Sequence, residues 1–245
     1  MAGLEPDARV FSSQDALFKA AAVVFVDAAA EAVGERGRFL VCLSGGTTPQ
    51  GLYALLAQSP QRDSIDWTRV HAFWGDERCV PPEDLNSNYR TAADLLLSRV
   101  PIPSENIHRV RTELEPELAA GDYALTLRRF AEPPYAWPRF DLVLLGLGED
   151  GHTASLFPGA KDDYEGPTLA VRSSDSQRPG WRVTLTPPVF NAARRILFLV
   201  HGAGKSKVVA DVLYGGRRPE LLPAQQIRPA DGELIWMLDN AAAAR

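Results

Sequence analysis

The chain has 245 residues and a mass of 26.8 kDa, with 45% hydrophobic and 23% charged residues. This composition excludes a disordered or fibrous protein. Its 26 Lys and Arg against 31 Asp and Glu give a formal net charge of −5, so we expect no nucleic-acid partner, although a local positive pocket for a small anion is compatible with this charge. At about 100–200 residues per domain, and without internal repeats, the chain is predicted to form a single domain over residues 1–245.

The start of the chain has no basic segment typical of a secretory signal. The longest early apolar run, residues 20–26, is much shorter than the ~20 residues of a membrane span. We therefore expect a cytoplasmic protein with no membrane partner.

Cys42 and Cys79, together with four histidines, show neither CxxC nor HExxH spacing, so we expect no metal and no cofactor.

Ser12 and Asp15 predict a capping box for a first helix that ends near Gly34. One face of this helix is expected to be buried and carries Leu17, Ala21, Val24 and Ala28. The continuous apolar run Phe39–Leu43 is typical of a buried strand in a parallel sheet. A Gly-Gly turn follows, and then a helix with Thr48 as its N-cap and Pro49 at its first position.

The same alternation of strand and helix continues to the end of the chain. It predicts an α/β fold with a mostly parallel sheet flanked by helices, a Rossmann-like open sheet. Further helices are predicted at residues 88–100, 115–131 and 205–213, and residues 132–138 are predicted to form a loop. Further strands are predicted at Val70–Trp74, 107–110 (a minor strand), 140–145, Trp181–Leu185, Arg195–Val200 and 233–238.

Four turns that follow predicted strands carry residues with useful chemistry. Ligands of open α/β sheets bind beyond the carboxyl ends of the strands, so the convergence of these turns is the main functional signal. The turns are Ser44-Gly-Gly-Thr-Thr48, Gly75-Asp-Glu-Arg78, Gly146 to His152, and His201-Gly-Ala-Gly-Lys205.

The first turn suits a phosphate, because two glycines let the backbone approach a ligand and a helix N-terminus offers free amides. A tight turn without a ligand is the simpler alternative.

Gly146 to Gly151 matches the letters GxGxxG, but Pro158 interrupts the helix that a dinucleotide site needs. His152 is a candidate general base, and Lys205 is a candidate counter-charge for a phosphate. Each is equally compatible with an ordinary surface position.

The chain resembles the 6-phosphogluconolactonases over nearly its whole length. The most specific segment is Gly148-Glu-Asp-Gly-His-Thr-Ala-Ser-Leu-Phe-Pro158. It is supported by Leu43-Ser-Gly-Gly-Thr47, Gly75-Asp-Glu-Arg-Cys-Val-Pro81, Ser87-Asn-Tyr-Arg90, Arg182-Val-Thr-Leu-Thr186, Asn191-Ala-Ala-Arg194 and Gly202-Ala-Gly-Lys205. The resemblance implies hydrolysis of 6-phospho-D-glucono-1,5-lactone to 6-phosphogluconate in the oxidative pentose phosphate pathway.

The same fold family includes glucosamine-6-phosphate isomerases/deaminases, and this activity is the rival interpretation. That branch usually has Asp-Glu-Tyr where this chain has Asp76-Glu77-Arg78. It also has a glutamate five residues after the histidine, where this chain has Phe157, which cannot relay a proton. The resemblance therefore favours the lactonase.

The resemblance also implies roles for individual residues. We expect His152 to take a proton from the attacking water without a metal, and Arg78 to stabilise the oxyanion. Asp76 is expected to orient His152 or to bind a sugar hydroxyl, and Asn88 to bind sugar hydroxyls. The phosphate is expected to bind Ser44, Gly45, Gly46, Thr47, Arg182 and Lys205.

A non-catalytic sugar-phosphate sensor with the same pocket is a third hypothesis. Retention of His152, Arg78 and Asp76 argues against it, because binding alone needs no base. The expected partner is a small sugar-phosphate lactone, and the expected oligomeric state is a monomer or weak homodimer.

Overall fold

The computed structural model describes residues 7–159, 164–173 and 180–244. A six-stranded sheet runs through its middle, and all the strand pairs in it are parallel. The predicted mostly parallel α/β sheet flanked by helices is thus confirmed. In spatial order the strands are β1 (Asp7–Phe11), β9 (Glu233–Asp239), β8 (Arg195–Val200), β5 (Leu142–Leu145), β2 (Phe39–Leu43) and β3 (Val70–Trp74).

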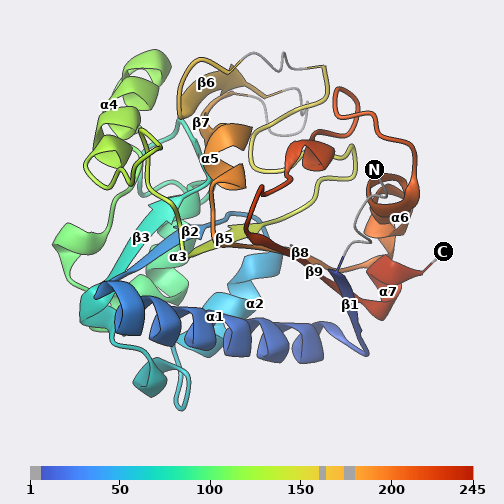
Figure 1. Cartoon of the computed structure of the whole chain (residues 1–245), viewed down its shortest axis with the longest axis horizontal. Helices are drawn as coiled ribbons and strands as arrows, with labels where there is room; N and C mark the ends of the chain where they lie inside the picture. Colours follow the sequence, from blue (N-terminus) through green and yellow to red (C-terminus); the bar gives the residue numbers. More distant parts are fainter. Residues whose placement is uncertain (1–6, 160–163, 174–179, 245) are drawn as a thin grey trace.

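Both faces of the large sheet are covered, so the molecule has layers (Figure 1). Below the sheet in this view lies α1 (Gln14–Arg36), which packs on α2 (Thr48–Leu56), and α2 contacts α3 (Asn88–Leu95). On the other face lie α4 (Pro116–Arg128), α5 (Pro187–Asn191) and a small second sheet. α6 (Ser206–Tyr214) and α7 (Asn240–Ala243) pack together near the β1 edge.

Strand β2 shows why an uninterrupted apolar run is needed in this position. Its five residues are all buried. Val41 and Leu43 belong to the core beneath the sheet, together with Leu17 and Phe25 of α1. Leu40 and Cys42 point into the second core on the opposite face. A strand covered on both sides needs apolar residues at every position.

The second sheet is antiparallel and was not predicted. Its order is β4 (Asp76–Arg78), β7 (Trp181–Leu185) and β6 (Thr168–Arg172). The prediction placed β7 among the strands of a mostly parallel sheet, and this placement was wrong. Gly75 joins the two sheets, because its N–H donates to Leu43 O (2.9 Å) and its carbonyl accepts from Leu185 N (2.8 Å).

Several predicted element boundaries differ from the structure. The N-cap of α1 is Ser13, whose hydroxyl accepts from Ala16 N, and not Ser12. This helix continues past Gly34 to Arg36, because Gly37 provides the left-handed conformation that ends it (φ 71°). The N-cap of α2 is Thr47 instead of Thr48.

Four predicted elements are shorter than expected. The helix predicted at 115–131 spans Pro116–Arg128, and the strand predicted at 140–145 begins only at Leu142. The helix predicted at 88–100 ends at Leu95 and continues as a short 3₁₀ turn. Val100 is extended (φ −127°, ψ 153°), as expected for the residue before Pro101. The minor strand predicted at 107–110 is only an isolated bridge between Ile107 and Ala72.

His71 and His108 form a half-buried pair beside the start of β3. Their rings stack with centroids 5.5 Å apart, and His71 Nδ1 lies 3.2 Å from His108 Nε2. Phe130 packs against both rings. Burial and the neighbouring His71 lower the pKa of His108 to about 4, and burial also lowers the pKa of His71.

This pair predicts a loss of stability in acid. Between pH 6.5 and about 4, the unfolded chain binds a proton at His108 that the folded chain does not bind. The free energy of unfolding should therefore be highest above pH 6.5 and fall as the pH drops toward 4. Urea unfolding at pH 7 and pH 4.5 tests this. The His108→Phe variant, which keeps a ring but cannot titrate, should lose less stability over the same interval; an equal loss would contradict the prediction.

Candidate active site

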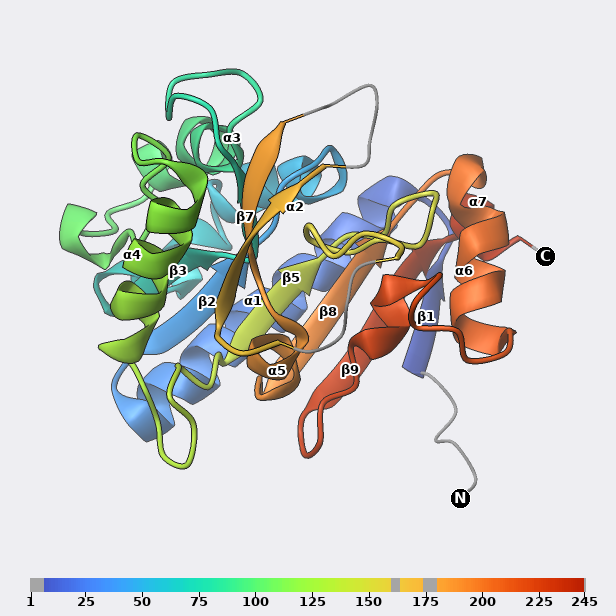
Figure 2. The same ribbon diagram turned by 90° about the horizontal axis from the view of Figure 1, so that it is seen from above.

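The four predicted turns meet at one edge of the large sheet. They follow β2, β3, β5 and β8, which are neighbours in the order β8-β5-β2-β3 and run parallel. β2, β5 and β8 lie side by side in Figure 2 as well. The carboxyl ends of parallel neighbours face the same side, so the side chains on these turns come from distant segments but share one region.

The turn after β2 presents backbone amides at the start of α2. Tyr53 fixes its first residue, because its hydroxyl accepts from Ser44 N (3.0 Å) and donates to Ser44 O (2.7 Å). Gly46 has a positive φ of 89°. The amides of Gly45 and Gly46 donate to no group in the described part of the chain. This is the arrangement that binds an anion at a helix N-terminus.

Asn88 connects this turn to the turn after β3. A Cβ on Gly45 would lie 1.8 Å from Asn88 Oδ1, so only glycine fits against this side chain. The amide Nδ2 of Asn88 donates to the backbone carbonyl of Asp76 (2.8 Å) and to its carboxylate (3.2 Å). The other carboxylate oxygen of Asp76 accepts from Ser155 Oγ (2.7 Å). Asp76 is thus buried and held from two sides.

The neighbouring carboxylate, Glu77, holds the start of α3 in place. It is 2% exposed and accepts from the N–H groups of Asn88 and Tyr89, both at 2.7 Å, at the start of α3. Ser87 Oγ donates to it as well (3.1 Å). Burial raises the pKa of Glu77, and these backbone hydrogen bonds oppose the rise. Glu77 therefore fixes α3 beside the site.

His152 is held by Asp150, two residues earlier in the same turn. Asp150 Oδ1 lies 2.5 Å from His152 Nδ1 and accepts from His152 N at 3.1 Å. Burial alone would raise the pKa of Asp150, but the hydrogen bonds and charge of His152 outweigh burial and lower it. With Nδ1–H directed at a carboxylate, Nε2 carries the lone pair that can accept a proton.

This arrangement corrects one of the two roles expected for Asp76, the orientation of His152. The carboxylate in contact with His152 is Asp150, whereas Asp76 binds Asn88 and Ser155. Asp150 and Ser155 were both missed as site residues. The Asp-x-His spacing was a usable signal, because aspartate side chains commonly bond backbone two residues ahead. The contact of Ser155 with Asp76 spans 79 residues, and no local pattern predicts it.

Gly148 and Gly151 shape the turn around the histidine. A Cβ on Gly148 would lie 2.1 Å from His152 Nδ1 and 2.6 Å from Asp150 Oδ1. Gly151 has a φ of 86°. Gly148 therefore lets the imidazole and its carboxylate lie directly against the backbone, and Gly151 provides the left-handed conformation of the turn.

Phe157 lies between His152 and Arg182. Its ring centroid is 5.2 Å from that of His152, and Arg182 Cζ lies 5.3 Å from the same ring. Arg182 is buried and stands directly opposite Arg78 in the β4–β7 pairing. Arg78 Nη1 donates to Asn86 O (2.5 Å), and its buried Nε has no hydrogen-bond partner among the described residues. Two guanidinium groups thus emerge on one face of the small sheet, a pairing that an anion would stabilise.

Lys205 follows β8 and lies near the acidic part of the histidine turn. Burial lowers its pKa, while the charges of Glu149 and Asp150 act in the opposite direction. A Cβ on Gly204 would approach Glu149 Oε1 to 3.1 Å, so the two turns are in close contact.

Within the described residues, no group of three His, Cys, Asp or Glu side chains is arranged to hold a metal ion. In the same residues, no helix has both the length and the apolar character needed to cross a bilayer.

Comparison with known proteins identifies relatives along nearly the whole chain. Residues 12–236 match the family described as glucosamine-6-phosphate isomerases/6-phosphogluconolactonase. A 6-phosphogluconolactonase of Synechocystis is 39% identical over 241 residues, which cover 98% of each chain. 6-Phosphogluconolactonase 3, chloroplastic, of Arabidopsis thaliana is 40% identical and covers 86% of this chain and 66% of its own length.

Solved structures agree with these sequence relatives. The 6-phosphogluconolactonase of Thermotoga maritima superposes with a TM-score of 0.84 at 29% identity, covering 96% of this chain and all of its own. A monomeric glucosamine-6-phosphate deaminase has the same TM-score of 0.84, with 97% and 99% of the chains covered, at only 19% identity. The second likeness shows a common fold and does not distinguish the two activities.

Proposed function

Because this chain belongs to the glucosamine-6-phosphate isomerase/6-phosphogluconolactonase family, we propose that it hydrolyses 6-phospho-D-glucono-1,5-lactone to 6-phosphogluconate, with His152 as the general base. The enzyme is a lactone hydrolase like its relatives. The observation that carries the proposed mechanism is the Asp150–His152 contact of 2.5 Å at the meeting point of the four turns.

The proposed reaction begins with water beside His152 Nε2. The imidazole accepts a proton as the water oxygen attacks the lactone carbonyl carbon, and Asp150 stabilises the imidazolium that forms. Arg78 stabilises the negative charge on the carbonyl oxygen. Collapse of this tetrahedral intermediate breaks the ring C–O bond, and the proton on His152 passes to the departing ring oxygen.

In the same proposal the phosphate binds the amides of Gly45 and Gly46 and the hydroxyls of Ser44 and Thr47. Lys205 and Arg182 supply positive charge. Support comes from the unpaired amides of this turn and from its contact with Asn88. Asp76, held by Asn88 and Ser155, accepts a hydrogen bond from a sugar hydroxyl.

Two residues support the lactonase over the deaminase. Phe157 occupies the position where the deaminase branch usually has a glutamate, and here its ring packs on His152 and under Arg182. Arg78 occupies the position of the usual tyrosine, and a guanidinium stabilises an oxyanion more strongly than a phenol does.

Offering the protein both substrates tests the proposed function. The lactone is generated in situ from glucose 6-phosphate, and its loss is followed above the spontaneous background. Ammonia release is measured in parallel with glucosamine 6-phosphate. Rapid lactone loss without ammonia is expected. Ammonia release without lactone turnover would mean a deaminase, and binding of phosphate sugars without either activity would mean a sensor.

Lys205→Ala should mainly raise KM. The phosphate is bound in both the ground state and the transition state, so its loss weakens binding more than it slows chemistry. We expect KM to rise by about tenfold or more, since charge-assisted contacts contribute ~1.5–3 kcal/mol, while kcat changes little. Steady-state kinetics measure both constants, with Lys207→Ala as the control because Lys207 is exposed and pairs with Asp211 outside the site. An unchanged KM would remove Lys205 from the site.

Three further expectations are proposals as well: a single domain, a cytoplasmic location, and a monomer or weak homodimer. Relatives from Arabidopsis and rice are named as chloroplastic. Light scattering of the purified protein measures its oligomeric state directly.

A further inference from the structure

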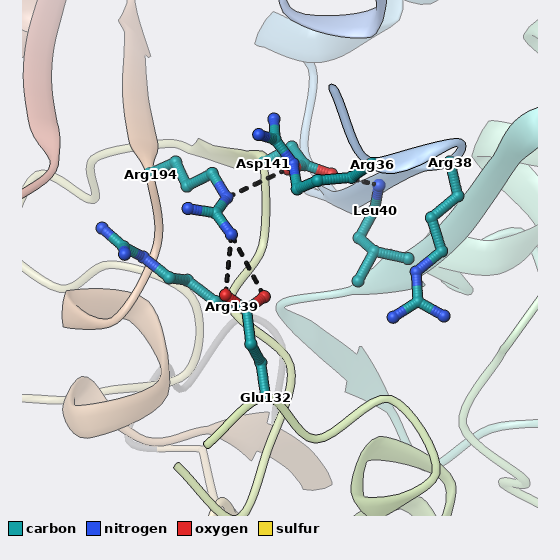
Figure 3. A pocket seen from close by; sticks show the side chains of 7 residues that line it. All are labelled: Arg36, Arg38, Leu40, Glu132, Arg139, Asp141 and Arg194. Carbon is teal, nitrogen blue, oxygen red and sulfur yellow. Dashed lines mark hydrogen bonds and ion pairs between the residues drawn. The ribbon is translucent and has the colours of Figure 1, made fainter. Parts of the chain in front are cut away.

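A charged pocket lies at the opposite end of the large sheet from the active site. It has a volume of about 300 Å³. Leu40 lies near the start of β2, and Asp141 and Arg194 directly precede β5 and β8. Because β2 has five residues, roughly 15 Å of strand separates the two ends. The pocket is lined by Arg36, Arg38, Leu40, Glu132, Arg139, Asp141 and Arg194 (Figure 3).

The lining of this pocket is positively charged. Four arginines against two carboxylates give 4 − 2 = +2. Two further carboxylates pair with these arginines from outside, Glu35 with Arg36 and Asp231 with Arg139. Both are mostly exposed, at 61% and 58%, and ion pairs of exposed carboxylates are weak because water screens them.

The carboxylate of Asp141, just before β5, binds the start of β2 and the end of α1. Its side chain is only 5% exposed. It accepts from Leu40 N at 2.7 Å and from Arg36 Nε at 3.0 Å. Arg194 Nε lies 3.3 Å from Asp141 Oδ1 without forming a hydrogen bond. Asp141 thus fixes the floor of the pocket and orients two of the guanidinium groups.

Several guanidinium donors in the pocket form no hydrogen bond with the described residues. No carboxylate in the described part of the chain pairs with Arg38, whose guanidinium packs over the Phe130 ring at 5.6 Å. Arg194 uses Nη2 for Glu132 (2.8 and 3.1 Å), whereas its buried Nε is ion-paired with Asp141 and forms no hydrogen bond within the described residues. Arg139 uses Nε for Ala192 O and Nη2 for Asp231. Donors on separate guanidinium groups are common ligands of a phosphate group.

We propose that this pocket binds the phosphate dianion of a small molecule, as a site separate from catalysis. A dianion matches the net charge of the lining, and about 300 Å³ is at the small end of ligand pockets. The proposal depends on the arginines before β2, β5 and β8 and on no residue of the active site.

Calorimetry with inorganic phosphate and with phenyl phosphate tests the proposal. Both are titrated into Lys205→Ala, in which binding at the catalytic edge is weakened. One binding event is expected to persist and to weaken about tenfold or more in Lys205→Ala/Arg38→Ala, since contacts to a charged group are among the strongest single hydrogen bonds. Lys205→Ala/Arg62→Ala is the matched control, because Arg62 is an exposed arginine paired with Asp63 outside the pocket.

A second variant tests the sign of the charge effect. Lys205→Ala/Glu132→Gln removes one negative charge from the lining and should bind phosphate more tightly. Binding of phenyl phosphate alone would identify the ligand as a phosphate ester, and binding of inorganic phosphate would show that the group itself suffices. Absence of binding to Lys205→Ala, or equal binding with and without Arg38, would overturn the proposal.

The two proposed sites can be tested independently of each other. Arg38→Ala alone should retain the wild-type rate of lactone hydrolysis, because Arg38 lies at the other end of the sheet. Loss of phosphate binding in the pocket with intact hydrolysis therefore supports this site, whatever the outcome for His152.

Discussion

His152→Ala is expected to lower kcat for lactone hydrolysis by about 10²–10⁴-fold, the usual contribution of a general base. Water beside the lactone would then have no group to accept its proton, while the Ser44–Thr47 turn and Lys205 would still bind the phosphate. The affinity for 6-phosphogluconate should therefore stay close to that of the unchanged enzyme. Rates above the spontaneous background and calorimetry with the product measure the two effects separately.

Asp150→Asn is the matched control for this experiment. The amide keeps the shape of the side chain but removes the charge that faces His152 Nδ1 at 2.5 Å. Its kcat should fall less than that of His152→Ala, because the base is still present but is less well oriented and its protonated form is less stabilised. If His152→Ala retained its turnover, another group would be the base and the proposed mechanism would be wrong.

The sequence predicted the strands that are buried on both faces. β2 and β8 appeared as apolar runs with the observed bounds, because such strands need apolar residues at consecutive positions. β3 and β7 were also predicted with the observed bounds, although they contain the polar residues His71 and Arg182. The four turns could also be placed on one edge, since the strands before them are parallel. For these parts, local composition and fold-level rules were sufficient.

Two strands with exposed faces and one short polar strand were missed. No residue of β1 or β6 is fully buried, and β4 is only three residues long with the polar sequence Asp-Glu-Arg. These strands are stabilised by their pairing partners, β9 for β1 and β7 for the other two. Long-range pairing of this kind leaves no periodic pattern in the sequence. The antiparallel sheet that carries Arg78 and Arg182 therefore became visible only in three dimensions.

The contacts within the site were harder to predict than its members. His152, Asp76 and Lys205 could be named as candidates from their turns, but their partners depend on side-chain directions. Asp150 pairs with His152 because Gly148 leaves room for both side chains. Predicting that contact requires the turn geometry and not only the order of residues.

Gly148→Ala should therefore be among the most harmful small substitutions in the chain. The new Cβ would lie 2.1 Å from His152 Nδ1 and 2.6 Å from Asp150 Oδ1, so the imidazole and its carboxylate must move. A displacement of about 1 Å at a catalytic group can cost ~10²-fold in rate. We expect kcat to fall by roughly 10–100-fold while product affinity changes little, as measured by steady-state kinetics and calorimetry.

Gly146→Ala is the matched control in the same turn. A Cβ at Gly146 would meet nothing within 4 Å, and neither Gly146 nor Gly148 has a positive φ. The two variants therefore add the same methyl group at positions without a positive φ, and the contact with His152 and Asp150 is made at Gly148 alone. Equal kcat values for the two variants would show that the position of His152 does not limit catalysis. A large loss confined to Gly148→Ala would show that this glycine is required because the histidine lies directly against it.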